Sequence, residues 1–364
     1  RRGLLGQLSL FFSPYINNVN FFGSIFTFLY LLQIILFLIV ISKFKNSSIL
    51  IIFFSLSPAL ILFSIYDPES YMRKDLFFNL AILLHSIFAS KNTVLKKNIN
   101  EYKCFLLYCL IPFLFINILI HEIQIFFISI HILISFVIFD KNFKIFLKSF
   151  FAKIYLVLSL PAILVFLNSG TPEQVLLITE SLNQYGSQII QAPFDIMKGN
   201  INLMLGQILK VMVYYTYIDF INFFFAFILS IILFLYVFLF LITKNVLIIK
   251  KSLLKIYGLF FIPVLLVFIA GTDFGRWLNI ISMHIVAFFL IFKINYKIDI
   301  FKKLSISTII SFSVLGILLF SYIFLWIIPT ACCWFGLKVF SSSLFEQLYD
   351  SSIFYYNFIN EYIV

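Results

Sequence analysis

Long apolar runs separated by short polar connections dominate the pattern of hydrophobic and polar positions along the chain. Each run has roughly 16 to 25 residues, the length of α-helix that crosses the hydrocarbon core of a bilayer. We therefore expect an all-α fold, a polytopic transmembrane bundle of about ten spans in one membrane domain over residues 1–364, and an eleventh span if one precedes Arg1. The runs cover residues 21–42, 49–65, 75–90, 104–120, 123–139, 149–168, 217–243, 256–271, 277–292 and 304–328.

Lysine residues gather in every second polar connection. Because cytoplasmic loops of membrane proteins are enriched in Lys and Arg, this alternation predicts that the lysine loops lie in the cytoplasm and the other loops outside. All four arginines, Arg1, Arg2, Arg73 and Arg276, fall on the outer side. A guanidinium binds phosphate or carboxylate through two hydrogen bonds, so the outer face is predicted to bind anions.

The composition supports the membrane class. Apolar residues make up 63% of the 364 residues and charged residues 11%, which is too little polar surface to cover a soluble globule. The net charge of +11 reflects the lysine loops, and we expect no nucleic-acid partner. The four cysteines show no spacing typical of a metal site or a disulfide framework, and we expect no metal and no cofactor.

The segment 271–277 places an acid and an arginine between two apolar runs. It contains Asp273 and Arg276, and His284 follows Arg276 by eight residues, close to two helical turns on one face. Ionisable groups at membrane depth are costly unless they face a polar cavity or a partner, which favours a functional site. The alternative is an Asp–Arg pair that only terminates two helices at the interface.

Three histidines lie below the predicted outer loops. His85 follows Lys74 by three helical turns, His131 follows Gln124 by two, and His284 lies on a third helix. Each histidine alone is typical of a hydrogen-bonded packing residue, whereas the three together favour a buried polar pocket.

Two further outer segments carry candidate chemistry. His121 and Glu122 mark a chain reversal, and Glu122 is a candidate general base whose charge state His121 or Arg276 would hold. The alternative is an interfacial turn wetted by lipid headgroups. Arg73 and Lys74 precede another span and are positioned to bind a phosphate group, or else to pair with Asp67 and Glu69, which stand in the same loop.

The segment 169–216 is the longest extramembrane stretch, predicted to be periplasmic. A capping pattern at its start and two stripes of apolar residues at helical spacing predict two amphipathic helices across the outer surface. They would form a lid or groove wall for a long substrate, or simply lie among the headgroups.

Four short motifs, together with the topology, resemble the Wzy-type repeat-unit polymerases of O-antigen and capsule synthesis, or the related EpsG-like proteins. The motifs are Arg1-Arg2-Gly3-Leu4-Leu5-Gly6, Arg73-Lys74-Asp75, Ile120-His121-Glu122 and Asp273-Phe274-Gly275-Arg276-Trp277. The resemblance implies a glycosyltransferase of the bacterial inner membrane, acting at the periplasmic face. It would transfer a growing glycan from one polyprenyl diphosphate to another lipid-linked repeat unit, with the bilayer and other polysaccharide-assembly proteins as partners and without a metal or a nucleotide sugar.

The same resemblance implies roles for particular residues. Arg276, Arg73 and Lys74 would bind the diphosphate, and Glu122 or His121 would be the acceptor base. His284 would either position the reacting residues or act in acid–base chemistry, and the supporting residues would be Asp273, His131 and His85. One departure is that segment 169–216 contains no arginine, only Lys198 and Lys210.

Other functions fit parts of the same pattern. A glycosyltransferase that uses polyprenyl monophosphate sugars would place its catalytic acid in the first outer loop, at Asp67 or Glu69. A lipid-linked glycan flippase or transporter would also need cations in a cavity, but we expect it to show internal repeats, which this sequence lacks. A membrane acyltransferase with a histidine base is a further alternative.

Overall fold

The computed structural model of this chain describes residues 18–44, 51, 54–63, 73–95, 99–139, 143–167, 251–270 and 274–295, with isolated positions elsewhere. Within these residues all regular structure is helical, which confirms the predicted all-α class for the described part. The predicted spans over 217–243 and 304–328 and the amphipathic helices of 169–216 lie outside the described residues, apart from such isolated positions.

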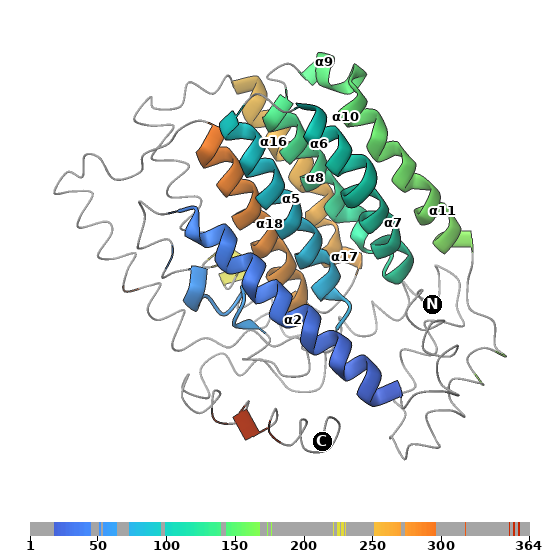
Figure 1. Cartoon of the computed structure of the whole chain (residues 1–364), viewed down its shortest axis with the longest axis vertical. Coiled ribbons are helices and arrows are strands. Elements are labelled where there is room, and N and C mark those ends of the chain that lie inside the picture. The colour runs from blue at the N-terminus through green and yellow to red at the C-terminus, as the bar shows by residue number, and fades with distance from the viewer. Residues whose placement is uncertain are drawn as a thin grey trace.

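A bundle around the central helix α5 forms the core of the described part. Helix α5 packs against α2, α8 and α18, and its contact with α18 is the most extensive of all (Figure 1). The helices are α2 (Asn18–Ser42), α5 (Asp75–Leu95), α6 (Ile99–Phe105), α7 (Ile111–Ile120), α8 (Gln124–Phe139), α9 (Phe143–Lys148), α10 (Phe150–Lys153), α11 (Ser159–Leu167), α16 (Lys251–Leu265), α17 (Val267–Ala270) and α18 (Phe274–Asn295). A π-helical turn, η2 (Leu106–Leu110), joins α6 to α7, and a 3-10 turn, η3 (Ile154–Leu158), joins α10 to α11.

Two helical stretches in the described part are long and apolar enough to cross a membrane. They are Gly23–Ser42 in α2 and the continuous stretch Ile99–Ile120 through α6, η2 and α7. Among three shorter apolar helices, Gln124–Ile138 and Phe150–Val165 pack against α7, and Gly275–Ile291 packs against α5 and α8. Length and composition of these helices indicate membrane association.

The chain reverses between α7 and α8, as the polar pair there predicts. Helix α7 ends at Ile120, His121 takes an extended conformation, and α8 begins at Gln124. The His121 amide still donates to the Asn117 carbonyl at 2.8 Å, so the turn is tied to the last turn of α7.

The backbone near Pro58 departs from the single helix predicted over 49–65. Residues 54–56 are helical, and turns then run from Pro58 as far as Leu62. Proline lacks an amide proton and disfavours a continuous helix. The buried carbonyls that the break releases need other donors, and side chains of α2 and α18 supply them.

Candidate functional site

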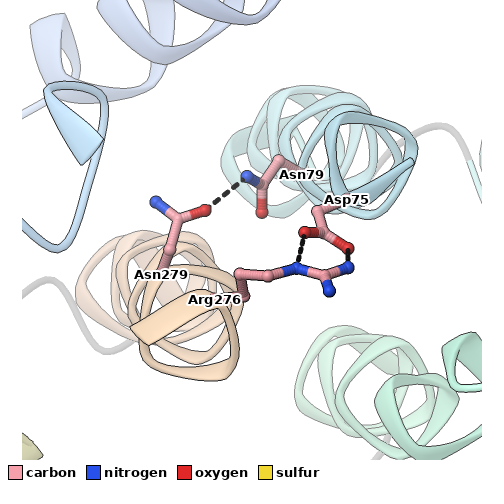
Figure 2. Close-up of polar contacts among 4 residues, drawn as sticks. All are labelled: Asp75, Asn79, Arg276 and Asn279. Carbon is pink, nitrogen blue, oxygen red and sulfur yellow. Dashed lines mark hydrogen bonds and ion pairs between the residues drawn. The ribbon is translucent and has the colours of Figure 1, made fainter. Parts of the chain in front are cut away.

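The N-terminal ends of α5 and α18 lie together, and each contributes one ionised side chain (Figure 2). Asp75 is the first residue of α5, and Arg276 lies in the first turn of α18. Arg276 donates from Nε to Asp75 Oδ2 at 2.6 Å and from Nη2 to Asp75 Oδ1 at 2.8 Å. Both side chains are 11% exposed, so this two-bond ion pair is largely shielded from solvent and fixes the orientation of the guanidinium.

A pair of asparagines continues the contact one helical turn below the ion pair. Asn79 Nδ2 donates to Asn279 Oδ1 at 3.0 Å (Figure 2). Asn279 Nδ2 in turn donates to the carbonyls of Ala59 and Leu60, at 3.1 and 2.9 Å. The asparagine pair therefore links α5, α18 and the turns after Pro58.

The turn between α7 and α8 brings further polar groups to the same end of the bundle. Lys74 Nζ donates to the Ile120 carbonyl at 3.5 Å, and His121 Nδ1 lies 3.7 Å from Glu122 Oε2. The His121 ring contacts the Trp277 ring edge to face, with centroids 6.5 Å apart. We use the name ionic cluster for Arg73, Lys74, Asp75, His121, Glu122 and Arg276.

The ionic cluster carries an excess of positive charge. Its three cations, Arg73, Lys74 and Arg276, and its two carboxylates give a net charge of 3 − 2 = +1 when His121 is neutral. Burial lowers the pKa of His121 from its ordinary value, against the opposing effect of Glu122, so the neutral ring is favoured at pH 7. Burial also lowers the pKa of Lys74, and Glu122 opposes this shift. A partly exposed cluster with this charge balance is suited to binding an anion.

A second polar group, the histidine network, is buried deeper in the bundle. His85 Nδ1 lies 2.9 Å from His131 Nδ1, and His85 Nε2 lies 2.6 Å from the Tyr102 hydroxyl. Ser135 Oγ lies 2.9 Å from both the Tyr102 and Tyr155 hydroxyls, and the Tyr155 hydroxyl donates to the His131 carbonyl at 3.2 Å. All five side chains are buried, so α5, α6, α8 and η3 meet around one closed set of hydrogen bonds.

His284 lies next to this network on α18. Its ring is nearly perpendicular to the His131 ring, with centroids 5.9 Å apart, and it also contacts Phe127 at 4.8 Å. His284 Nδ1 bonds to the Ile280 carbonyl at 2.8 Å. The imidazole is thereby fixed against its own helix and fully buried.

The structure thus separates the predicted site residues into two groups. Arg276, Arg73, Lys74, His121 and Glu122 lie together in the ionic cluster. The three other histidines, His85, His131 and His284, form the deeper group, with His284 two helical turns below Arg276. Asp273 lies outside the described residues.

Several polar residues of these groups were not among the predicted site residues. Asp75 is the first residue of the predicted span 75–90, and the structure makes it the partner of Arg276. Asn79 follows Asp75 by four residues and Asn279 follows Arg276 by three, so the helical spacing was a usable signal. Ser135 follows His131 by four residues on α8 and carried the same signal, whereas Tyr102 and Tyr155 lie on other elements and gave no comparable one.

Among the described residues, no group of three or more His, Cys, Asp or Glu side chains is arranged to hold a metal ion. Comparison with protein-family models, with curated proteins and with solved structures finds no match to this chain.

Proposed function

We propose that this chain is a multi-pass protein of the bacterial inner membrane that polymerises oligosaccharide repeat units carried on polyprenyl diphosphate at the periplasmic face. The observation that carries the proposal is the ionic cluster, a net positive group with an arginine of fixed orientation beside a partly exposed carboxylate. The apolar composition and the two long apolar helices support the membrane location.

The cationic side chains of the ionic cluster would bind the diphosphate of the donor lipid. During transfer, the bond between the sugar C1 and a diphosphate oxygen breaks, and the diphosphate leaves as an anion. Preorganised cations stabilise that developing charge most strongly where water is scarce. Asp75 holds the Arg276 guanidinium in place, so little reorganisation is needed when the diphosphate binds.

Glu122 would accept the proton of the acceptor hydroxyl. The hydroxyl oxygen forms the new bond to C1 while its proton passes to the carboxylate. The Glu122 side chain is 31% exposed, which leaves it accessible to an acceptor, and the neighbouring His121 is favoured in its neutral form. His121 Nδ1, 3.7 Å from Glu122 Oε2, would be close enough to share that proton after transfer.

Complementation of a host strain that lacks this gene tests the proposal. Surface polysaccharide is displayed on a gel for Arg276→Lys and Glu122→Gln at matched expression, with Glu101→Gln, an exposed carboxylate on α6, as the control for charge removal. We expect both test variants to reduce a ladder of chain lengths to single-repeat material, and the control to keep the ladder.

Two other outcomes would argue against the proposal. A ladder that both test variants leave unchanged would remove the ionic cluster from the reaction. Loss of even the single-repeat form would point to an earlier step, performed by a different lipid-linked-sugar transferase or by a flippase.

A further inference from the structure

The hydrogen bonds of the histidine network can run in only one direction. The His131 carbonyl can only accept, so the Tyr155 hydroxyl donates to it. Tyr155 has no second proton, so Ser135 must donate to Tyr155, and Tyr102 must donate to Ser135. His85 then donates from Nε2 to Tyr102, and its Nδ1 accepts from His131 Nδ1–H.

This direction and the bond of His284 to the Ile280 carbonyl together fix the tautomers of three imidazoles. His131 carries its proton on Nδ1, which leaves a lone pair on Nε2. His284 must also carry its proton on Nδ1, because the Ile280 carbonyl can only accept, and its Nε2 has a lone pair too. Both Nε2 atoms are buried, and neither has a hydrogen-bond partner among the residues that the structure describes. His131 and His284 therefore present two acceptors side by side in the interior.

A second layer of unpartnered polar atoms lies two helical turns above them. Gln124 precedes His131 by seven residues on α8, and Trp277 precedes His284 by seven on α18, so each pair shares one face of its helix. Within the described part of the chain, neither amide atom of the buried Gln124 side chain has a partner, and neither does the indole nitrogen of Trp277. We call this contact between α8 and α18, from Trp277 and Gln124 to His131 and His284, the seam.

The upper end of the seam reaches the ionic cluster. The Trp277 ring contacts His121, and the buried Nδ1 atom of His121 likewise has no hydrogen-bond partner in the part of the chain that the structure describes. Unpartnered polar atoms thus lie at both ends of the seam, beside the ionic cluster and at the inner histidines. Because buried polar groups are nearly always hydrogen-bonded, these atoms indicate a bound ligand that both donates and accepts.

The surroundings of the seam favour a small neutral ligand. Among the described residues, the titratable side chains that face the two inner histidines are His85 on α5, Tyr102 on α6 and Tyr155 on η3, and none of these three is a carboxylate or an amine. Helix α7 and the described side chains of α16 offer no titratable group, and the lysines of α9 and α10 are exposed. A water molecule accepts from an indole or amide N–H and donates to an imidazole, as the seam requires.

We propose that the seam binds a file of water molecules that connects the ionic cluster to His131 and His284, and that the two Nε2 atoms receive protons that enter this file. A hydronium ion in the file gives its proton to an Nε2 lone pair and remains as water. A second proton on His85 Nδ1 would displace the hydrogen bond from His131. The last acceptor of the histidine network, the His131 carbonyl, cannot pass a proton on. Protons in the file therefore go no further than His131 and His284. The geometry of the unpartnered atoms carries the water file by itself. As the proposed acceptor base, Glu122 would release protons into this file, and this one step rests on the proposed function.

Nitrogen NMR of the full chain in lipid nanodiscs, with ¹⁵N-labelled histidine, tests the proposal. We expect the Nδ1–H tautomer for His131 and His284, the Nε2–H tautomer for His85, and magnetisation transfer from water to the two inner histidines. On acidification, His131 or His284 should become doubly protonated before His85. An Nε2–H tautomer at His131, or earlier protonation of His85, would overturn the proposal, and neither observation requires a variant.

Two substitutions locate the water. Gln124→Leu should weaken the transfer from water to His131 and His284 at least severalfold, whereas Gln33→Leu, a matched change of a buried glutamine on α2, should leave it unchanged. Equal transfer in both variants would refute a water file in the seam. A polymerase assay on the same samples separates the two proposals, because the tautomers and the water contacts do not depend on whether the chain transfers sugars.

Discussion

Replacement of Asn279 by alanine should destabilise the chain strongly, because one side chain holds three elements together. Its amide donates to the carbonyls of Ala59 and Leu60, and its Oδ1 accepts from Asn79. All of these residues are at most 5% exposed, so water cannot easily replace the lost partner. Asn279→Ala would leave two carbonyls and one amide N–H without their partner.

Two estimates, one per hydrogen bond and one per unsatisfied polar group, give the lower and upper limits of the loss in unfolding free energy. Hydrogen bonds between helices in membrane proteins average about 0.6 kcal/mol, which gives about 2 kcal/mol for three bonds. A buried polar group left unsatisfied costs about 1 to 3 kcal/mol, so three groups raise the upper limit to about 9 kcal/mol. Partial relaxation of the turns after Pro58 favours the lower half of this range, and we expect a loss of about 2 to 5 kcal/mol.

Reversible unfolding in mixed micelles, followed by circular dichroism, measures this loss. Asn79→Ala removes only one of the three bonds and should cost clearly less than Asn279→Ala. Asn279→Asp keeps an acceptor for Asn79 but directs a carboxylate oxygen at the two carbonyls and buries a charge, so its loss should be at least as large as that of Asn279→Ala. A loss of unfolding free energy below about 0.5 kcal/mol for Asn279→Ala would refute the role of Asn279 as the donor to the Ala59 and Leu60 carbonyls.

Three other predictions use the same unfolding measurement. Asp75→Asn should lower the unfolding free energy by about 3 kcal/mol, because it leaves Arg276 without its charged partner. Adding Arg276→Met should recover part of that loss. A double variant less stable than the single one would contradict the ion-pair account. Tyr102→Phe should lower the unfolding free energy by about 1 to 3 kcal/mol, because it removes two buried hydrogen bonds. The control Tyr108→Phe changes a ring that is 80% exposed and should cost nothing measurable. Equal losses in the two variants would contradict the histidine network. Because the folded-state pKa of His121 lies below its ordinary value of 6.5, the unfolded chain binds this proton more readily, so stability should fall as the pH drops below about 6.5. His121→Gln should make that decline shallower, and an identical pH profile would contradict the shift.

The alternation of apolar runs and polar connections predicted much of the described fold. It predicted the helix that begins at Asp75 and the reversal at His121 and Glu122, because a polar pair within a long apolar stretch ends a span. It could not predict the break after Pro58. The donors that stabilise those turns come from Tyr30 and Asn279, which lie far away in the sequence.

Only part of the candidate site could be predicted from the sequence, because here too the partners lie far apart along the chain. Helical spacing indicates which residues share one face of a helix, but not which helices are neighbours. The three histidines were therefore expected in a common pocket, whereas the pairing of Asp75 with Arg276, 201 residues apart, depends on the packing of α5 against α18. Within that interface, the sequence indicates only that Asn79 lies one helical turn after Asp75 and that Asn279 lies one turn after Arg276.

The most direct test of the central claim is binding of polyprenyl diphosphate to the purified chain, followed by native mass spectrometry from nanodiscs with polyprenyl monophosphate as competitor. If the ionic cluster is a diphosphate site, the diphosphate lipid binds preferentially. Arg276→Lys then weakens its binding on the order of tenfold, the effect of losing one charge-assisted hydrogen bond. Equal binding of the two lipids, or diphosphate binding that Arg276→Lys leaves unchanged, would contradict the claim.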